Sequence, residues 1–202
     1  TQDIRMPMKT VVAEDGRELQ SSEKFELGRN FCNKLWNAAR FAFMNLEHNP
    51  QEPRASARAD TLSEGTVRTE TTTARAKAQG SSVESLPIED RWILSRTSAA
   101  AREVHGALLD FQFSRAMNAA RDFFWDELCD WYLELVKARV RDDRRADEAR
   151  QVLAFVLDQS LRLLHPFMPF ITEQLWSHLN TAVRQRGLPG VVELDADKPL
   201  IA

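Results

Sequence analysis

Segments with a helical hydrophobic period alternate along this chain with segments that have none. Apolar residues at three- and four-residue steps line one face of a helix, and that face packs against a core. Five segments follow this rule and predict helices over residues 22–46, 88–109, 112–139, 146–165 and 171–183. Pro166 and Pro169 separate the last two, because proline lacks an amide hydrogen and clashes with the preceding turn. The pattern therefore predicts an all-α fold, a bundle of about five main helices.

The third helical segment has the most regular pattern. Its first apolar stripe, at alternating steps of four and three, consists of Phe113, Met117, Ala120, Phe124, Leu128, Trp131 and Leu135. A second apolar stripe consists of Trp125, Cys129, Tyr132 and Val136. Two apolar stripes on one helix indicate neighbours on two sides, so we expect this helix to lie at the centre of the bundle.

The remaining segments suggest how the chain is divided. Residues 1–22 form a connector in which Asp15-Gly16 predicts the turn of a short hairpin. Residues 48–86 have no apolar pattern and are rich in Thr, Ser, Ala, Arg and Glu, which predicts a long polar insertion, at least partly mobile. The helical domain is then expected over residues 23–186, followed by a tail, 187–202, with room for one short strand.

Composition and charge limit the kind of partner. With 43% hydrophobic residues among 202, the chain can bury one sizeable core, and seven glycines and eight prolines suit long helices better than a β-sandwich. The formal net charge is -3 at pH 7, so the protein as a whole repels phosphate. Any site for nucleic acid must therefore be a local patch of positive charge.

Two cysteines and the N-terminus point to a cytoplasmic fragment. Cys32 and Cys129 are too far apart in sequence for a zinc-ligand motif and too few for a disulfide framework. We interpret them as small buried apolar residues in a reducing cytosol. The sequence has no apolar run long enough to span a bilayer and no signal segment, and it begins at Thr1 without a methionine. We expect a piece cut from a longer protein.

No catalytic constellation is visible. The four histidines are scattered, there is no glycine-rich phosphate loop, and we expect neither a metal nor a cofactor in this chain. His165 precedes Pro166, where an imidazole more commonly stabilises a helix end than acts in catalysis. Asp126, Asp130 and Glu134 share one helix face, which is usually a solvated face, although carboxylates there could accept hydrogen bonds from the amino groups of bases.

The outward face of the first helix carries a different chemistry. Residues at steps of four, three and four, with two flanking positions, form an asparagine-rich stripe: Asn30, Asn33, Lys34, Asn37, Arg40 and Phe41. Asparagine is a mediocre helix former, so its repetition here calls for another reason. Single-stranded RNA supplies one, because amides read base edges, cations hold phosphates and aromatic rings stack on unpaired bases. Spacing alone leaves open the alternative that the polar residues pack on a loop while Phe41 is core.

Four sequence blocks carry a resemblance to a known family. Residues 28–41 (GRNFCNKLWNAARF) resemble the segment that opens the anticodon-binding domain of valyl-tRNA synthetases, and 123–134 (FFWDELCDWYLE) resemble its central helix. Residues 90–96 (DRWILSR) fit the start of the second helix. Residues 163–176 (LLHPFMPFITEQLW) are similar to the closing helix pair, which the isoleucine and leucine enzymes share. The first two blocks therefore favour valine over isoleucine.

The resemblance implies a binding domain without catalysis. The family consists of class I enzymes that join valine to tRNA using ATP and Mg, and its ATP-handling motifs are absent from this sequence and would lie upstream of Thr1. The chain is thus expected to bind the tRNA(Val) anticodon loop as a monomer and not to charge tRNA. Family contacts to that loop carry over onto Lys34, Arg40, Phe41, Leu133 and Glu134.

Two further interpretations compete with this one. A helical module that binds protein could use the asparagine-rich stripe as the polar rim of an apolar groove, with tryptophans as anchors. Cations beside one aromatic ring suit RNA better than a partner helix. An intact small enzyme is excluded because no assembled site is visible. The insertion at 48–86 departs from the compact connection that the family leads us to expect.

Overall fold

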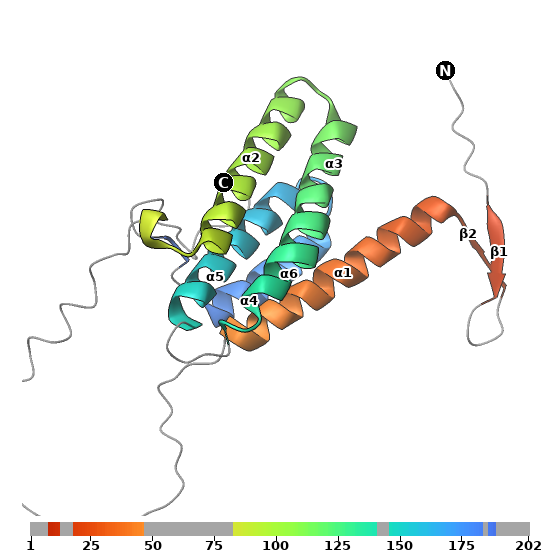
Figure 1. The fold of residues 1–202 in the computed structure, drawn as a ribbon. Coiled ribbons are helices and arrows are strands. Elements are labelled where there is room, and N and C mark those ends of the chain that lie inside the picture. Colours follow the sequence, from red (N-terminus) through yellow and green to blue (C-terminus); the bar gives the residue numbers. More distant parts are fainter. Residues whose placement is uncertain (1–7, 13–17, 47–82, 141–145, 184–185, 189–202) are drawn as a thin grey trace, which may run out of the picture. The chain divides into compact units, whose positions relative to one another are not determined.

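The computed structural model describes residues 8–12, 18–46, 83–140, 146–183 and 186–188 (Figure 1). Nearly all of these residues are helical, which confirms the all-α prediction. The chain divides into two compact units, residues 1–41 and 42–202, and each is described by itself. The predicted polar insertion and tail lie almost wholly outside the described residues.

The first unit contains a hairpin and most of a long helix. Strands β1 (Lys9–Val12) and β2 (Glu18–Ser21) pair antiparallel with Val11 opposite Leu19, so the predicted hairpin is confirmed, while its Asp-Gly turn lies outside the described residues. Helix α1 follows at Glu23–Leu46. The amide of Phe25 lies 3.5 Å from the hydroxyl oxygen of buried Ser22, which caps the first turn.

The second unit is a bundle whose elements follow one another with short connections. After a single 3₁₀ turn, η2 (Val83–Ser85), come α2 (Ile88–Leu109) and then an unbroken helical run made of α3 (Phe113–Asp122), the π-helix η3 (Phe123–Tyr132) and α4 (Leu133–Val136). Helices α5 (Ala146–Leu164) and α6 (Pro169–Ala182) complete it. The run α3–η3–α4 is called the third helix below. It packs against both α2 and α5, as a central helix should.

The predicted helix boundaries hold to within a few residues. The bounds of α2 are the predicted ones, and α5 ends one residue earlier than expected. Helix α6 begins at Pro169, two residues earlier than predicted. Proline is tolerated there because the first turn of a helix does not use its amide hydrogens.

The third helix buries every fourth residue. The positions concerned are all at most 2% exposed: Ala116, Ala120, Phe124, Leu128, Tyr132, Val136 and Val140. In an α-helix of 3.6 residues per turn, a line of four-residue steps rotates by about 40° per step and soon leaves the core. In the π-helix each turn holds more residues, so the line rotates back in the opposite sense. The wider winding therefore keeps one line of side chains in the core along the whole helix.

The first predicted stripe is wrong at four of its seven positions, two of them before the π-helix and two at or after its end. Phe113, Met117, Trp131 and Leu135 are 60%, 44%, 64% and 49% exposed. The prediction assumed an uninterrupted α-helical period, in which steps of three and four alternate. In the second predicted stripe, Cys129, Tyr132 and Val136 are buried and Trp125 is partly buried, so that stripe is largely confirmed.

A buried polar cluster joins the start of α2 to the end of the third helix. Asp90 is fully buried and accepts a hydrogen bond from the Tyr132 hydroxyl at 2.9 Å. Both terminal nitrogens of Arg139 donate to its two oxygens at 2.8 Å. Burial acts to lower the pKa of Arg139, but the hydrogen bonds and negative charge of Asp90 outweigh it, and the pKa is raised. The cluster ties together two segments about fifty positions apart in sequence.

A second cluster holds Arg186, four positions after the end of α6. Arg186 and Asp158 are both fully buried, with Nε of Arg186 3.2 Å from a carboxylate oxygen of Asp158. The guanidinium groups of Arg162 and Arg186 lie 4.6 and 4.4 Å from the centre of the Trp176 ring, within cation–π range. Burial lowers the pKa of Arg186 although Asp158 opposes the shift. Charge and ring together hold position 186 against α5 and α6.

Tyr132 should titrate abnormally. Burial, followed by the nearby charge of Asp90, raises its pKa well above 10.0. Since Tyr132 is the chain's single tyrosine, tyrosinate absorbance reports on it alone. We expect no titration near pH 10.0 in the folded protein and normal titration in urea. The unfolded chain then releases a proton that the folded chain keeps, so the free energy of unfolding should fall as pH rises above 10.0. A folded protein that titrates normally would contradict the burial of Tyr132.

Arg139→Ala should destabilise the fold strongly, because it leaves the fully buried Asp90 carboxylate without its cation. Loss of one partner of a buried pair costs about 3–5 kcal/mol. Arg121→Ala serves as the control, since its pair with Asp122 is exposed and such pairs contribute about 1 kcal/mol or less. Urea denaturation of both variants measures the difference. Equal losses would show that the Asp90 cluster adds nothing to stability.

Candidate nucleic-acid interface

The asparagine-rich stripe lies on the exposed side of α1. Asn30, Asn33, Asn37 and Arg40 are exposed, while Lys34 and Phe41 are partly buried and contact other residues. The residues on the other side of α1 are buried: Phe31, Leu35, Ala39 and Ala42. The amides and the Arg40 guanidinium are therefore presented outward. Phe41 is neither fully core nor fully exposed, so part of its ring is accessible for stacking.

Leu133 and Glu134 stand at the start of α4, in the second unit. The Glu134 side chain is exposed and forms an ion pair with Lys137 one turn further on. Leu133 as a whole residue is only 7% exposed, so it offers a partner almost no surface. The sequence prediction thus places an accessible carboxylate at 134 and a core side chain at 133.

The exposed side of η3 and α4 is acidic and carries the aromatic residue Trp131. Asp126, Asp130 and Glu134 are all exposed, as expected of a solvated face. Trp131 lies among them and is 64% exposed. The sequence prediction placed Trp131 in the core, and the line of buried four-residue steps is the signal that would have excluded it. π-Helical segments are rare in proteins, and those that occur are often found at functional sites. This surface is therefore a second candidate site, in addition to the stripe.

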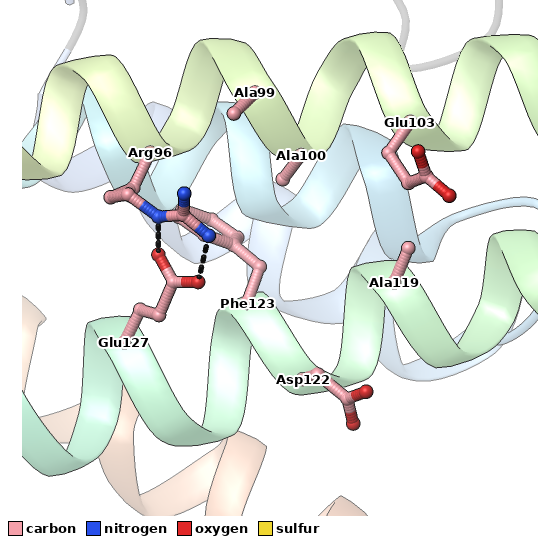
Figure 2. Close-up of a pocket in the computed structure, with 8 residues that line it drawn as sticks. All are labelled: Arg96, Ala99, Ala100, Glu103, Ala119, Asp122, Phe123 and Glu127. Atoms are coloured by element: carbon pink, nitrogen blue, oxygen red, sulfur yellow. Dashed lines mark hydrogen bonds and ion pairs between the residues drawn. The ribbon is translucent and has the colours of Figure 1, made fainter.

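A cleft of 320 Å³ lies between α2 and the third helix (Figure 2). Arg96 closes one end through two hydrogen bonds of 2.6 Å to Glu127, and these bonds, with the charge of Glu127, raise the pKa of Arg96. Glu103 and Asp122 lie toward the other end, while three alanines and Phe123 line the apolar part. One cation among three carboxylates repels phosphate, so this cleft is unsuited to an RNA backbone.

The remaining candidate groups have structural roles. His165 is buried, and its Nδ1 lies 2.8 Å from the hydroxyl oxygen of Thr172 in α6, which supports the structural interpretation. Both cysteines are free, with Cys129 buried and Cys32 partly buried. Across the described ranges, no cluster of His, Cys, Asp and Glu could hold a metal ion. Within the same ranges, no helix has the length and apolarity that a membrane crossing needs.

Comparison with known proteins agrees with this helical architecture. A family model described as the anticodon-binding domain of tRNA ligase matches residues 90–195, slightly more than half of the chain. The match covers α2, the third helix, α5 and α6. The chain therefore belongs to the family of anticodon-binding domains of tRNA ligases.

Three similar curated proteins carry the same name. A valine–tRNA ligase from Rhodopirellula baltica is 43% identical over 173 residues, which is 86% of this chain and 14% of that protein. The valine–tRNA ligase of Dehalococcoides mccartyi is 44% identical over 77% of this chain and 14% of that protein. That of Thermotoga maritima is 37% identical over 85% of this chain and 16% of that protein. The chain thus spans about one seventh of the length of the relatives it matches.

Proposed function

We propose that this chain is the anticodon-binding part of a valine–tRNA ligase and binds the anticodon loop of tRNA(Val). The observation that carries the proposal is the exposed asparagine-rich stripe on α1, whose residue types are those that unpaired RNA requires. The family match and the names of the relatives support it. The parent enzyme would act in the cytoplasm as a monomer, and parts of it outside this chain would join valine to tRNA with ATP and Mg.

Each residue of the stripe has a role in this proposal. Phe41 stacks on an unpaired base, and Lys34 and Arg40 hold phosphates or base acceptors. The outward amides of Asn30, Asn33 and Asn37 can each donate and accept, so they suit the edges of bases. Because the net charge is -3, a site for nucleic acid must be a local patch of positive charge. The stripe meets this requirement, since its six residues include two cations and no carboxylate.

Glu134 would act differently. An exposed carboxylate only accepts hydrogen bonds, so it favours bases with an exocyclic amino group, adenine and cytosine among them. Its ion pair with Lys137 offsets the repulsion that a bare carboxylate exerts on nearby phosphates. Asp126 and Asp130, on the same side of the helix, direct the RNA backbone away from this surface. Glu134 would thus contribute selectivity more than affinity, and the buried Leu133 would act through core packing.

A binding titration tests the proposal. We expect the 202-residue chain to bind tRNA(Val), and to lose that affinity when the anticodon bases are changed. Affinity should fall with salt, with a logarithmic slope of about -0.7 for each phosphate that Lys34 or Arg40 neutralises. Measurement at two salt concentrations with both tRNAs gives both quantities. Binding that ignores the anticodon would reduce the interaction to unspecific attraction of phosphate and would favour the protein-binding alternative.

Phe41→Ala should weaken binding to tRNA(Val) about 5- to 100-fold, because one stacked base contributes roughly 1–3 kcal/mol. The circular dichroism spectrum should be unchanged, since Phe41 is only partly buried. Phe25→Ala is a matched control, because Phe25 is an exposed aromatic residue of the same helix, outside the stripe. Affinity equal to that of the unmodified chain in both variants would remove Phe41 from the interface.

A further inference from the structure

A tight turn joins α2 to α3 (Figure 1). Four large apolar side chains at and beside this turn are exposed. Leu109, Phe111, Phe113 and Met117 are 66%, 80%, 60% and 44% exposed, and together they are called the apolar turn. The rings of Phe111 and Phe113 meet edge to face, with centroids 6.4 Å apart. Met117 lies one helical turn after Phe113, on the same side of α3. Clustered exposed side chains of this kind commonly mark an interaction surface.

The backbone conformation makes Phe111 an unfavourable choice for the fold itself. Its φ is 56°, in the left-handed region that crowds any side chain against the following carbonyl. The amide of Gln112 donates to the Ala107 carbonyl at 2.8 Å and the amide of Phe111 to Leu108 at 3.1 Å. This is a Schellman ending, in which the left-handed position is usually glycine. An exposed aromatic residue held there against local preference points to a role outside folding.

The charges around the turn favour a protein partner over nucleic acid. Residues 102–122 contain three arginines and three carboxylates, so there is no excess of positive charge. The arginines are also engaged, Arg115 with Glu103 at 2.6 Å, Arg121 with Asp122, and Arg102 with the Ser98 hydroxyl. RNA affinity depends mainly on cations that neutralise phosphate, and this surface offers none in excess. An apolar protein surface matches the turn better.

We propose that the apolar turn docks against another domain of the same polypeptide. This rests on the proposed function. In the matched relatives, about six sevenths of the polypeptide lies outside the region that this chain matches. A linked domain is present at a high effective concentration, so a contact made by a few side chains can hold. A stable dimer of two copies requires a much larger buried area than four side chains on one turn provide. A linked domain therefore suits the apolar turn better as a partner than a second copy of the chain does.

Hydroxyl-radical footprinting measures the docking directly, because it reports side-chain exposure at Phe111, Phe113 and Met117. The 202-residue chain is compared with the full-length polypeptide that contains it. We expect these residues to react several-fold more slowly in the full-length protein. Phe111→Gly combined with Phe113→Ser in the full-length protein should return the reactivity of Met117 to its value in the short chain. Equal reactivity of all three residues in both proteins would overturn the proposal.

The isolated chain supplies the second measurement. Phe111→Gly should raise its thermal midpoint by about 2–4 °C, because glycine accepts the left-handed conformation. A lower midpoint would mean that Phe111 serves the local fold, which overturns the proposal. Protection that grows with the concentration of the short chain, or that requires added tRNA(Val), would assign the turn to a second copy or to RNA and overturn it as well. The anticodon titration is independent of these results, so docking and anticodon binding can fail separately.

Discussion

The third helix must keep one line of side chains in the core while it packs against α2 and α5. A purely α-helical winding would carry that line around the helix, and a purely π-helical winding would carry it the other way. The succession of α3, η3 and α4 balances the two, so positions four residues apart from Ala116 to Val140 stay buried. The same balance keeps Asp126, Asp130 and Glu134 together on the outside. Core packing and the acidic surface are therefore two results of one winding.

The buried ion pairs complete this arrangement at its ends. Arg139 leaves the third helix and returns to Asp90 at the start of α2, so the two helices cannot slide along each other without separating a charge from its partner inside the core. Arg186 fixes the segment after α6 in the same way, through its contacts with Asp158 and Trp176. Compared with apolar residues of similar volume, buried pairs of this kind add little net stability, but an alignment of the helices that separates the partners leaves a charge unpaired in the core. We regard both as alignment devices.

The helices could be predicted from the sequence because burial of one helix face produces a regular hydrophobic spacing. That is why the bounds of α2 and the existence of all five helical segments were predicted correctly. The π-helix was missed because an α-helical period was assumed throughout, and Trp131 was consequently assigned to the core. The ion pairs were out of reach, since a chain with 27 basic and 30 acidic residues offers many combinations and spacing does not select among them. On the site, helical geometry predicted the outward stripe of α1, whereas the burial of Leu133 depends on tertiary packing.

The wide winding of η3 also limits how the chain can change over generations. Removal or addition of one residue within Phe123–Tyr132 would turn everything after it by roughly a quarter of a turn. Such a change would swing Glu134 toward the interior and carry Tyr132 and Arg139 away from Asp90. Substitutions on the exposed side have no such effect. On the exposed side of this helix, residues can thus be substituted, whereas the number of residues in the helix has to stay the same. Differences in length between related chains are therefore expected in the connections.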